Sequence, residues 1–305
     1  MNTSVILCTH NPRSDYLRGC LDGLRRQTLL RDRWELVVVD NRSDELVAGI
    51  VDLSWHPYAR VFREETLGLT PARLRGICEA SGDLLVFVDD DNVLDTDFLE
   101  EALRVADEKA FLGSWSGQCR PEFEQPPPEW TRRYWGNLVI REFDRDVWSN
   151  SPRLPESMPC GAGLCVRRNV AEHYLSLHDA GKRPFQFDRA GDSLISGGDN
   201  DLAACACDLG LGVGLIASLK LTHLIPQERL SEDYLARLTE GVYFSSVLLD
   251  SCRGVPAVPR RALSRAAYFL RLLLAKQPHR RMMQAANRGR EQALKVLASR
   301  DTAGL

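Results

Sequence analysis

The 305-residue sequence lacks a long uncharged apolar stretch. A helix that spans a bilayer needs about 20 consecutive apolar residues, and the longest apolar run near the C-terminal end, Tyr268 to Ala275, is interrupted by Arg271. The first nine residues (MNTSVILCT) also lack the basic and apolar regions of a secretion signal. We therefore expect a cytoplasmic protein.

Disulfide and zinc patterns are missing among the cysteines, and low-complexity composition is missing as well. The nine cysteines are an odd number, and none forms a CxxC pair or a zinc-type spacing with histidine. We interpret most of them as small buried apolar side chains. Hydrophobic residues make up 44% and charged residues 27% of the chain, which is ordinary for a globular protein and excludes fibrous and disordered classes.

Charge is unevenly distributed along the chain. The formal net charge is -3, yet residues 253–305 hold twelve Lys and Arg against only Glu291 and Asp301. Apolar residues of the stretch 262–274 recur at helical spacing between arginines, which predicts a basic amphipathic helix. Such a helix can lie on an anionic membrane face or pack its apolar stripe on the protein body. It can also bind nucleic acid, which we do not expect here.

Apolar segments alternate with helical ones through the first half of the chain. We predict strands at 4–8, 34–40, around Val61 and at 83–92, with helices at 16–27 and from Pro71 onward. This alternation predicts an α/β fold with a doubly wound, mostly parallel sheet flanked by helices. Ligands of such sheets bind beyond the carboxyl ends of the strands. Those ends are Thr9-His10-Asn11, Asp40-Asn41 and Asp89-Asp90-Asp91.

The second half begins after the three consecutive prolines Pro126–Pro128, which are typical of a surface loop. It contains strand patterns at 160–168 and 213–221, and helical patterns from Asn169, after Gly198 and at 231–249. We divide the chain into residues 1–119, residues 120–252 as the second half, and residues 253–305 as a basic helical C-terminal segment.

Three aspartates in a row follow the apolar strand at 83–92. They could be a solvated strand end, or one of them could cap the next helix. Three adjacent carboxylates also repel one another unless a cation offsets their charge. Mg²⁺ and Mn²⁺ prefer oxygen ligands and commonly join protein carboxylates to substrate phosphates. We therefore expect Asp89, Asp90 and Asp91 to lie at a divalent metal site.

Six segments, in their order and spacing, resemble the family-2 glycosyltransferases of GT-A fold, which transfer a sugar from a nucleotide diphosphate sugar. The resemblance covers roughly residues 3–250, and it implies that 1–119 is the nucleotide-sugar-binding half and 120–252 the acceptor-binding and catalytic half. The segments are CTHNPR, VVVDNRSD, LGLTPARLRGICEASGDLLVFVDDDN, PCGAGLCVRR, GGDNDL and THLIP.

The resemblance implies a nucleotide-binding set at the ends of the first strands. The turn that holds Thr9 and Asn11, together with Asp40, is similar to the family's base pocket, and Arg73 to an arginine near the nucleotide. This chain departs from the family pattern at two positions. His10 replaces the usual Tyr or Phe, and Leu74 replaces the usual Asn after the arginine.

The resemblance also implies the metal ligands. Asp89 and Asp91 are similar to the DxD pair, with Asp89 and Asp90 also near the donor, and His223 is placed as the third ligand of many relatives. An imidazole among carboxylates suits Mn²⁺ and still permits Mg²⁺. The alternative for His223 is a satisfied core or loop histidine.

The expected catalytic base lies in the segment GGDNDL. By alignment with the family, Asp199 takes the base position, while Gly198 replaces the first acid of the usual Glu-Asp pair. Asp199 and Asp201 are two residues apart and cannot share one helix face, so we expect at most one in the cleft. Alternatively, Asp201 is the base, or both acids only stabilise a helix N-terminus.

Together with the fold, the resemblance implies an inverting, metal-dependent glycosyltransferase that uses a nucleotide sugar, for which we expect a UDP-linked donor, and a glycan or lipid-linked glycan acceptor. Its expected role is cell-surface or extracellular polysaccharide synthesis, with contact to an anionic membrane through residues 253–305. Two alternatives remain. The chain could be a nucleotide-sugar-binding protein without turnover, for which Gly198 is the sequence hint, or a metal-dependent phosphohydrolase.

Overall fold

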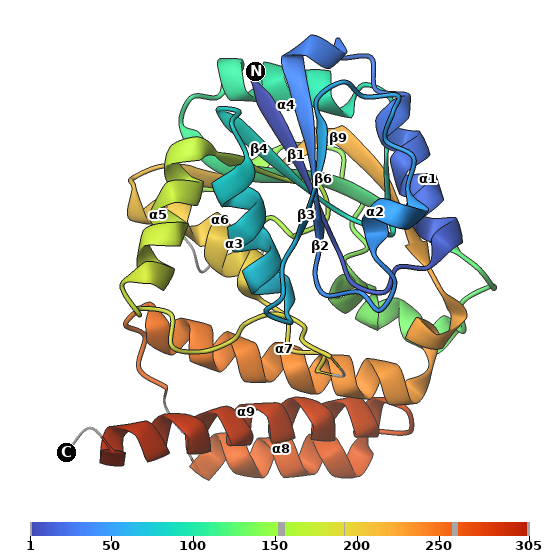
Figure 1. The fold of residues 1–305 in the computed structure, drawn as a ribbon. Coiled ribbons are helices and arrows are strands. Elements are labelled where there is room, and N and C mark those ends of the chain that lie inside the picture. The colour runs from blue at the N-terminus through green and yellow to red at the C-terminus, as the bar shows by residue number, and fades with distance from the viewer. Residues whose placement is uncertain (1, 152–155, 192, 258–261, 304–305) are drawn as a thin grey trace.

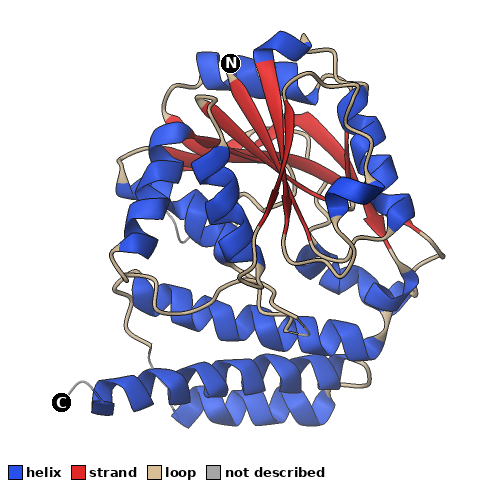
Figure 2. Ribbon diagram, viewed as in Figure 1, coloured by secondary structure: helices blue, strands red, loops and turns tan. Residues whose placement is uncertain are grey.

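The structure is a computed structural model that describes residues 2–151, 156–191, 193–257 and 262–303, with the backbone alone for 262–265 and 301–303. Within these residues the chain forms one nine-stranded sheet between layers of helices (Figure 2). The predicted α/β architecture is confirmed. The strands are β1 (Thr3–Thr9), β2 (Trp34–Asp40), β3 (Ala59–Arg63), β4 (Leu84–Asp89), β5 (Asn92–Leu94), β6 (Leu112–Phe123), β7 (Val147–Ser149), β8 (Leu164–Arg167) and β9 (Gly212–Ile225).

Helices cover both faces of the sheet, as Figure 1 shows. The α-helices are α1 (Ser14–Arg25), α2 (Val47–Ile50), α3 (Leu69–Glu79), α4 (Phe98–Glu108), α5 (Arg168–Asp179), α6 (Gly198–Asp208), α7 (Glu232–Cys252), α8 (Ala262–Leu274) and α9 (His279–Ala303). Three short 3-10 helices are η1 (Arg31–Arg33), η2 (Glu129–Leu138) and η3 (Gln227–Leu230).

The strand order is β3-β2-β1-β4-β8-β6-β9-β5, with β7 beside β9. The first four strands are parallel, whereas β8 runs antiparallel to both β4 and β6. The sequence of β1 is almost continuously apolar because both of its faces are buried under helices. Val5 and Leu7 pack in one core with α1 and α4, while Ile6 and Cys8 pack in the other with α3, α5 and α6.

The carboxyl ends of the parallel strands meet at one edge of the sheet. Thr9 pairs with Asp40, and Cys8 pairs with Asp89. The predicted strand at 83–92 is in fact two strands, because the chain turns after Asp89 and β5 starts at Asn92. In β5, Asn92 pairs antiparallel with His223 of β9. The turn therefore brings the aspartates next to a histidine that lies far away in the sequence.

The two predicted halves share this sheet, since β6 runs through the expected border at residue 119 and β9 pairs with both β6 and β5. Beyond the carboxyl edge lies a helical layer in which α9 packs on α7 and α8 packs on α9 (Figure 1). No helix in the described part of the chain is both long and apolar enough to cross a membrane.

Candidate active site

A cavity of about 310 Å³ opens at the carboxyl edge of the sheet and is lined by residues of both halves. All the predicted site residues except Asn11 and Asp40 line it. Its polar lining comprises Thr9, His10, Asn41, Arg73, Asp89, Asp90, Asp91, Asp188, Arg189, Ser196, Asp199, His223 and Arg229.

Asp89 and Asp90, at the end of β4, lie where their surroundings disfavour the charged form of a carboxylate. Burial, followed by repulsion from Asp91, raises the pKa of Asp90 to about 7. The same causes raise the pKa of Asp89. The hydroxyl of Thr9 at the end of β1 donates a hydrogen bond to Asp90. A positively charged ligand would stabilise this arrangement.

Asp91 differs from its neighbours because it has cationic partners. Arg229 Nη1 lies 2.8 Å from Asp91 Oδ2, and His223 Nε2 lies 3.4 Å from the same oxygen. Arg229 also lies 3.2 Å from His223 Nε2. Although burial opposes ionisation, His223 and Arg229 hold the pKa of Asp91 below its ordinary value.

The donor groups around Asp91 fit a divalent ion chemically. They are carboxylates and an imidazole, and His223 Nδ1 is buried without a hydrogen-bond partner among the described residues. Within the same residues, however, no three acidic, histidine or cysteine side chains converge into a ready metal site. The guanidinium of Arg229 supplies the positive charge there instead.

Asp199 lies at the start of α6 and lines the cavity. Its Oδ2 accepts a hydrogen bond from the Gly161 N–H at 2.6 Å, and its Oδ1 accepts one from the Asn200 N–H at 2.9 Å. These bonds fix the carboxylate, and because a carboxylate has about four acceptor positions, they leave it able to accept a proton. Gly161 belongs to the Gly-rich turn before β8, which the sequence singled out.

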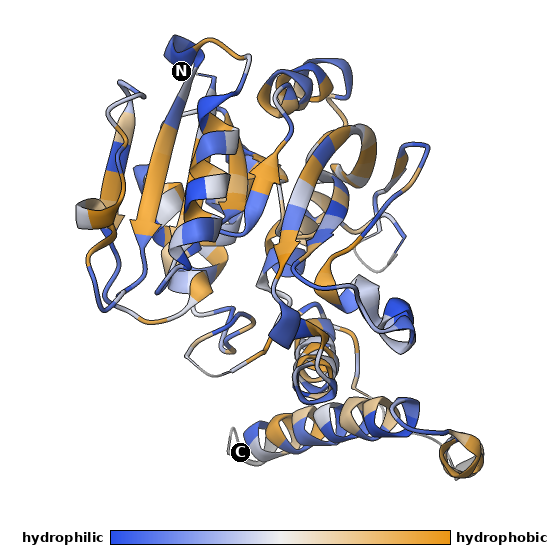
Figure 3. Ribbon diagram, turned by 90° about the vertical axis from the view of Figure 1, so that its right-hand side faces the viewer, coloured by the Kyte–Doolittle hydropathy of each residue, from blue (hydrophilic) through white to orange (hydrophobic). Residues whose placement is uncertain are grey.

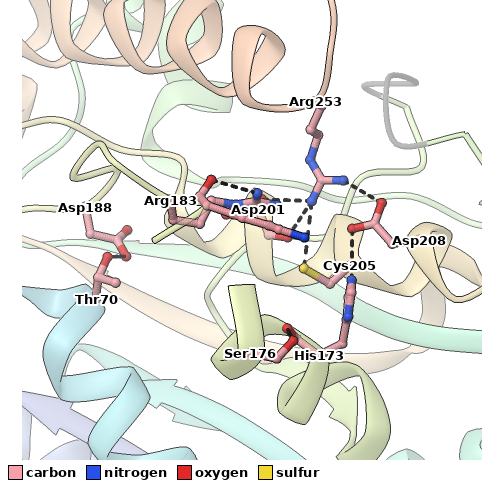
Figure 4. A network of polar contacts seen from close by, with 10 residues as sticks. Thr70, His173, Ser176, Arg183, Asp188, Asp201, Cys205, Asp208 and Arg253 are labelled. Carbon is pink, nitrogen blue, oxygen red and sulfur yellow. Dashed lines mark hydrogen bonds and ion pairs between the residues drawn. The ribbon is translucent and has the colours of Figure 1, made fainter. Parts of the chain in front are cut away.

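Asp201 is fully buried and does not line the cavity. Its carboxylate accepts hydrogen bonds from Arg183 Nη2 at 3.0 Å and from Arg253 Nη2 at 2.8 Å. Figure 4 shows Asp201 between these two side chains. Asp201 therefore joins α6 to the end of α7, and the geometry separates the two acids that the sequence left as alternatives.

Asp188 is a carboxylate of the cavity that sequence analysis missed. It accepts hydrogen bonds from Thr70 Oγ1 at 2.8 Å and Arg73 Nη1 at 3.0 Å, both from α3. A side chain at Gly198 would collide with it, because a Cβ there would lie 2.1 Å from Asp188 Oδ2. The carboxylate of Asp188, from another loop, thus occupies the space beside Gly198.

Asn11 and Asp40 stabilise loops beside the cavity. Asn11 exchanges side-chain hydrogen bonds with Asp44, at 3.0 Å to its carboxylate and 2.8 Å from its N–H. Asp40 accepts from the Ser43 N–H at 2.9 Å and from Arg63 Nη1 at 2.9 Å. Neither side chain lines the cavity, whereas Asn41, the residue after Asp40, does.

Arg229 and Cys8 are further lining residues that sequence analysis did not assign. Arg229 follows His223 by six residues and lies just beyond the segment THLIP, and nothing in the spacing shows its contact with Asp91. Burial raises the pKa of the Cys8 thiol to about 12, so the thiol stays protonated and is a poor nucleophile.

Residues 4–174 match the family described as glycosyl transferase family 2. EpsH of Bacillus subtilis (strain 168), which is named as a glycosyltransferase, is 30% identical over 115 residues, or 36% of this chain and 31% of EpsH. YwdF of the same organism, an uncharacterized glycosyltransferase by name, is 28% identical over 114 residues, or 37% of this chain and 41% of YwdF. The chain thus matches less than half the length of either relative.

Solved structures of S. aureus TarS share the fold. TarS 1–349 superposes with a TM-score of 0.53 at 18% identity, covering 83% of this chain and 69% of that one. Its complex with UDP-GlcNAc gives a TM-score of 0.54 at 18% identity, covering 81% and 67%. At such identity the likeness supports the GT-A fold.

Proposed function

Since the chain belongs to glycosyl transferase family 2, we propose that it transfers a sugar from a nucleotide diphosphate sugar to a glycan acceptor. The observation that carries the proposal is the convergence of Asp89–Asp91 and Asp199 on one cavity from opposite halves of the chain. The GT-A likeness to TarS, a protein solved with UDP-GlcNAc and with UDP, favours a UDP-linked donor.

Asp199 is the general base of this proposal. Its carboxylate takes the proton of the acceptor hydroxyl, and the freed oxygen attacks the anomeric carbon from the face opposite the diphosphate. The new carbon–oxygen bond forms while the bond to the diphosphate breaks, so the configuration inverts. Support comes from the fixed position of Asp199, which accepts hydrogen bonds from two backbone N–H groups at the cavity wall.

The donor lies against the wall that residues 1–119 contribute in this proposal. Thr9, Arg73, Asp89 and Asp90 are placed to surround the nucleotide and its sugar, and Asn41 extends this wall. Mn²⁺ or Mg²⁺, held by Asp89, Asp91 and His223, would stabilise the charge of the departing diphosphate. Arg229 and Arg73 carry further positive charge into the same cavity.

The acceptor in this proposal is a glycan or a lipid-linked glycan of a cell-surface or extracellular polysaccharide. A cytoplasmic protein with peripheral contact to the inner face of the membrane fits a lipid-linked acceptor. The basic segment 253–305 supports the membrane contact, because its excess of Lys and Arg attracts anionic lipid.

The test is thermal unfolding with nucleotide diphosphates and nucleotide sugars, each with Mn²⁺ and with EDTA, followed by assays of nucleotide release. A ligand of the native state raises the unfolding temperature. We expect a Mn²⁺-dependent shift with UDP and UDP release only when an acceptor glycan is present. Release without any acceptor would instead indicate a phosphohydrolase, and binding without release a nucleotide-sugar-binding protein. No shift with any nucleotide would refute the proposal.

A further inference from the structure

Helix α8 presents an apolar face to solvent. Phe269, Leu270, Leu273 and Leu274 are 61%, 60%, 71% and 75% exposed. Together with Ala266 they follow the spacing i, i+3, i+4, i+7 and i+8, so they lie on one side of the helix. These residues, 266, 269, 270, 273 and 274, form what we call the outer face of α8.

The opposite side of α8 packs on α9. Tyr268 and Leu272 are half-buried, and the Tyr268 hydroxyl donates a hydrogen bond to the Met283 carbonyl at 3.4 Å. The alternative in which the helix packs its apolar stripe on the protein body therefore does not describe the outer face. Figure 3 shows α8 at the margin of the molecule beyond α9, drawn mostly in the colour of hydrophobic residues.

The surroundings of the outer face are basic. Between Asp250 and Glu291 the sequence has no acidic residue. Arg271 and Lys276 are exposed, and Arg280 is half-buried. Among the described residues no carboxylate forms an ion pair with any of these three side chains. Their charge is thus available to an external partner, unlike that of Arg281 and Arg288, which pair with acids of α7.

We propose that the outer face of α8 docks on a bilayer that contains anionic lipid. Its apolar side chains enter the boundary between headgroups and acyl chains, while Arg271, Lys276 and Arg280 contact lipid phosphates. A second copy of the chain is a poorer occupant, because face-to-face packing would bring like charges together with no acidic residue of this segment to offset them. The docking rests on the membrane contact named in the proposed function, but it does not depend on the sugar transfer proposed for the cavity.

Vesicle co-sedimentation tests the proposal, with no donor or acceptor present. We expect the wild-type chain to bind vesicles of equal parts phosphatidylcholine and phosphatidylglycerol, and to bind phosphatidylcholine alone weakly. L273Q/L274Q should lower the partition coefficient on anionic vesicles by roughly tenfold or more. The matched control is Leu30→Gln, a residue that is 68% exposed just before β2 at the opposite edge of the sheet, and it should bind as the wild type does.

A second pair of variants separates the charge from the apolar contact. R271Q/K276Q should weaken binding to anionic vesicles and leave the weak binding to phosphatidylcholine unchanged, and added salt should have the same effect. Far-ultraviolet circular dichroism confirms that each variant is folded. Wild-type binding by L273Q/L274Q, or no binding by the wild-type chain, would overturn the proposal. A wild-type dimer that L273Q/L274Q dissociates in sedimentation velocity would assign the face to a second copy.

Discussion

The guanidinium of Arg229 lies 2.8 Å from the carboxylate of Asp91, at the place where the sequence predicts a metal ion. The two side chains are 20% and 8% exposed, so the pair is largely shielded from water. A cation belonging to the protein therefore stabilises Asp91, and any divalent ion must share that carboxylate with it.

Replacing Arg229 by Gln should show how far the buried carboxylate of Asp91 depends on this guanidinium. The loss leaves Asp91 as a buried carboxylate without its closest positive charge, which costs about 3–5 kcal/mol. We expect urea unfolding to show this loss, and added Mn²⁺ to stabilise R229Q more than the wild type. Arg229→Lys keeps the charge and is the control. Unchanged stability of R229Q in EDTA would show that Asp91 does not need this partner.

Asp199→Asn should leave nucleotide binding intact and remove turnover. The amide keeps the shape of the side chain but cannot accept the proton of an acceptor, and general-base catalysis contributes about 10²- to 10⁴-fold in rate. Isothermal titration with UDP and a UDP-release assay measure the two properties separately. Near wild-type turnover by D199N would contradict the assignment of the base.

Asp201→Asn is the contrasting variant, since it changes the other acid of the same helix. Here the expected effect is on stability, because Arg183 and Arg253 would be left buried without a full countercharge, at a cost of about 3–5 kcal/mol. Once folded at low temperature, the variant should turn over. A large loss of kcat with unchanged unfolding would exchange the roles of the two acids.

His56 should give the protein a pH-dependent stability. It is buried beside Trp34 with ring centroids 4.1 Å apart, and burial lowers its pKa to about 4. Between its ordinary pKa of about 6.5 and about 4, the imidazole of His56 is protonated in the unfolded chain and neutral in the folded chain. The free energy of unfolding should therefore fall by roughly 2–3 kcal/mol as the pH drops from about 6.5 to about 4.

Denaturant unfolding across this pH range checks the prediction. In His56→Gln, the contribution of this histidine to the slope of the unfolding free energy against pH should vanish. His10→Gln, which alters an exposed imidazole, should retain it. An identical slope in the wild type and His56→Gln would mean that other groups cause the pH dependence.

Gly198→Ala should destabilise the cavity wall. The added Cβ would lie 2.1 Å from Asp188 Oδ2, and that carboxylate is held by Thr70 and Arg73. Overpacking of this kind costs about 1–3 kcal/mol. Gly49→Ala in α2 is the control, because a Cβ there meets no atom within 4 Å. Thermal unfolding compares the two variants, and an equal midpoint would show that Asp188 moves aside freely.

The sequence predicted the parallel half of the sheet because each strand there is a local apolar run with a polar end. It also predicted the cluster Asp89–Asp91 and the helix that holds Asp199, since both are continuous in sequence. The contacts of Asp188 and Arg229 could not be predicted in this way. They arise when separate loops fold over the same edge of the sheet, and short segments carry no signal of that packing.

The orientation of α8 was unpredictable for a related reason. Its apolar spacing shows which residues share a side, yet only the packing of Tyr268 on α9 shows which side faces outward. Asp201 illustrates the same limit within one helix turn. Its spacing from Asp199 showed that the two acids differ, while Arg183 and Arg253 decide which one is buried.

A Cβ at Gly198 and the carboxylate of Asp188 cannot occupy the space between α6 and the preceding loop together. The two positions are mutually exclusive, since the same space accepts an acid anchored ten residues upstream or one on the helix itself. In this chain the space beside Gly198 holds the carboxylate of Asp188, which comes from a different part of the backbone and is bound there by Thr70 and Arg73.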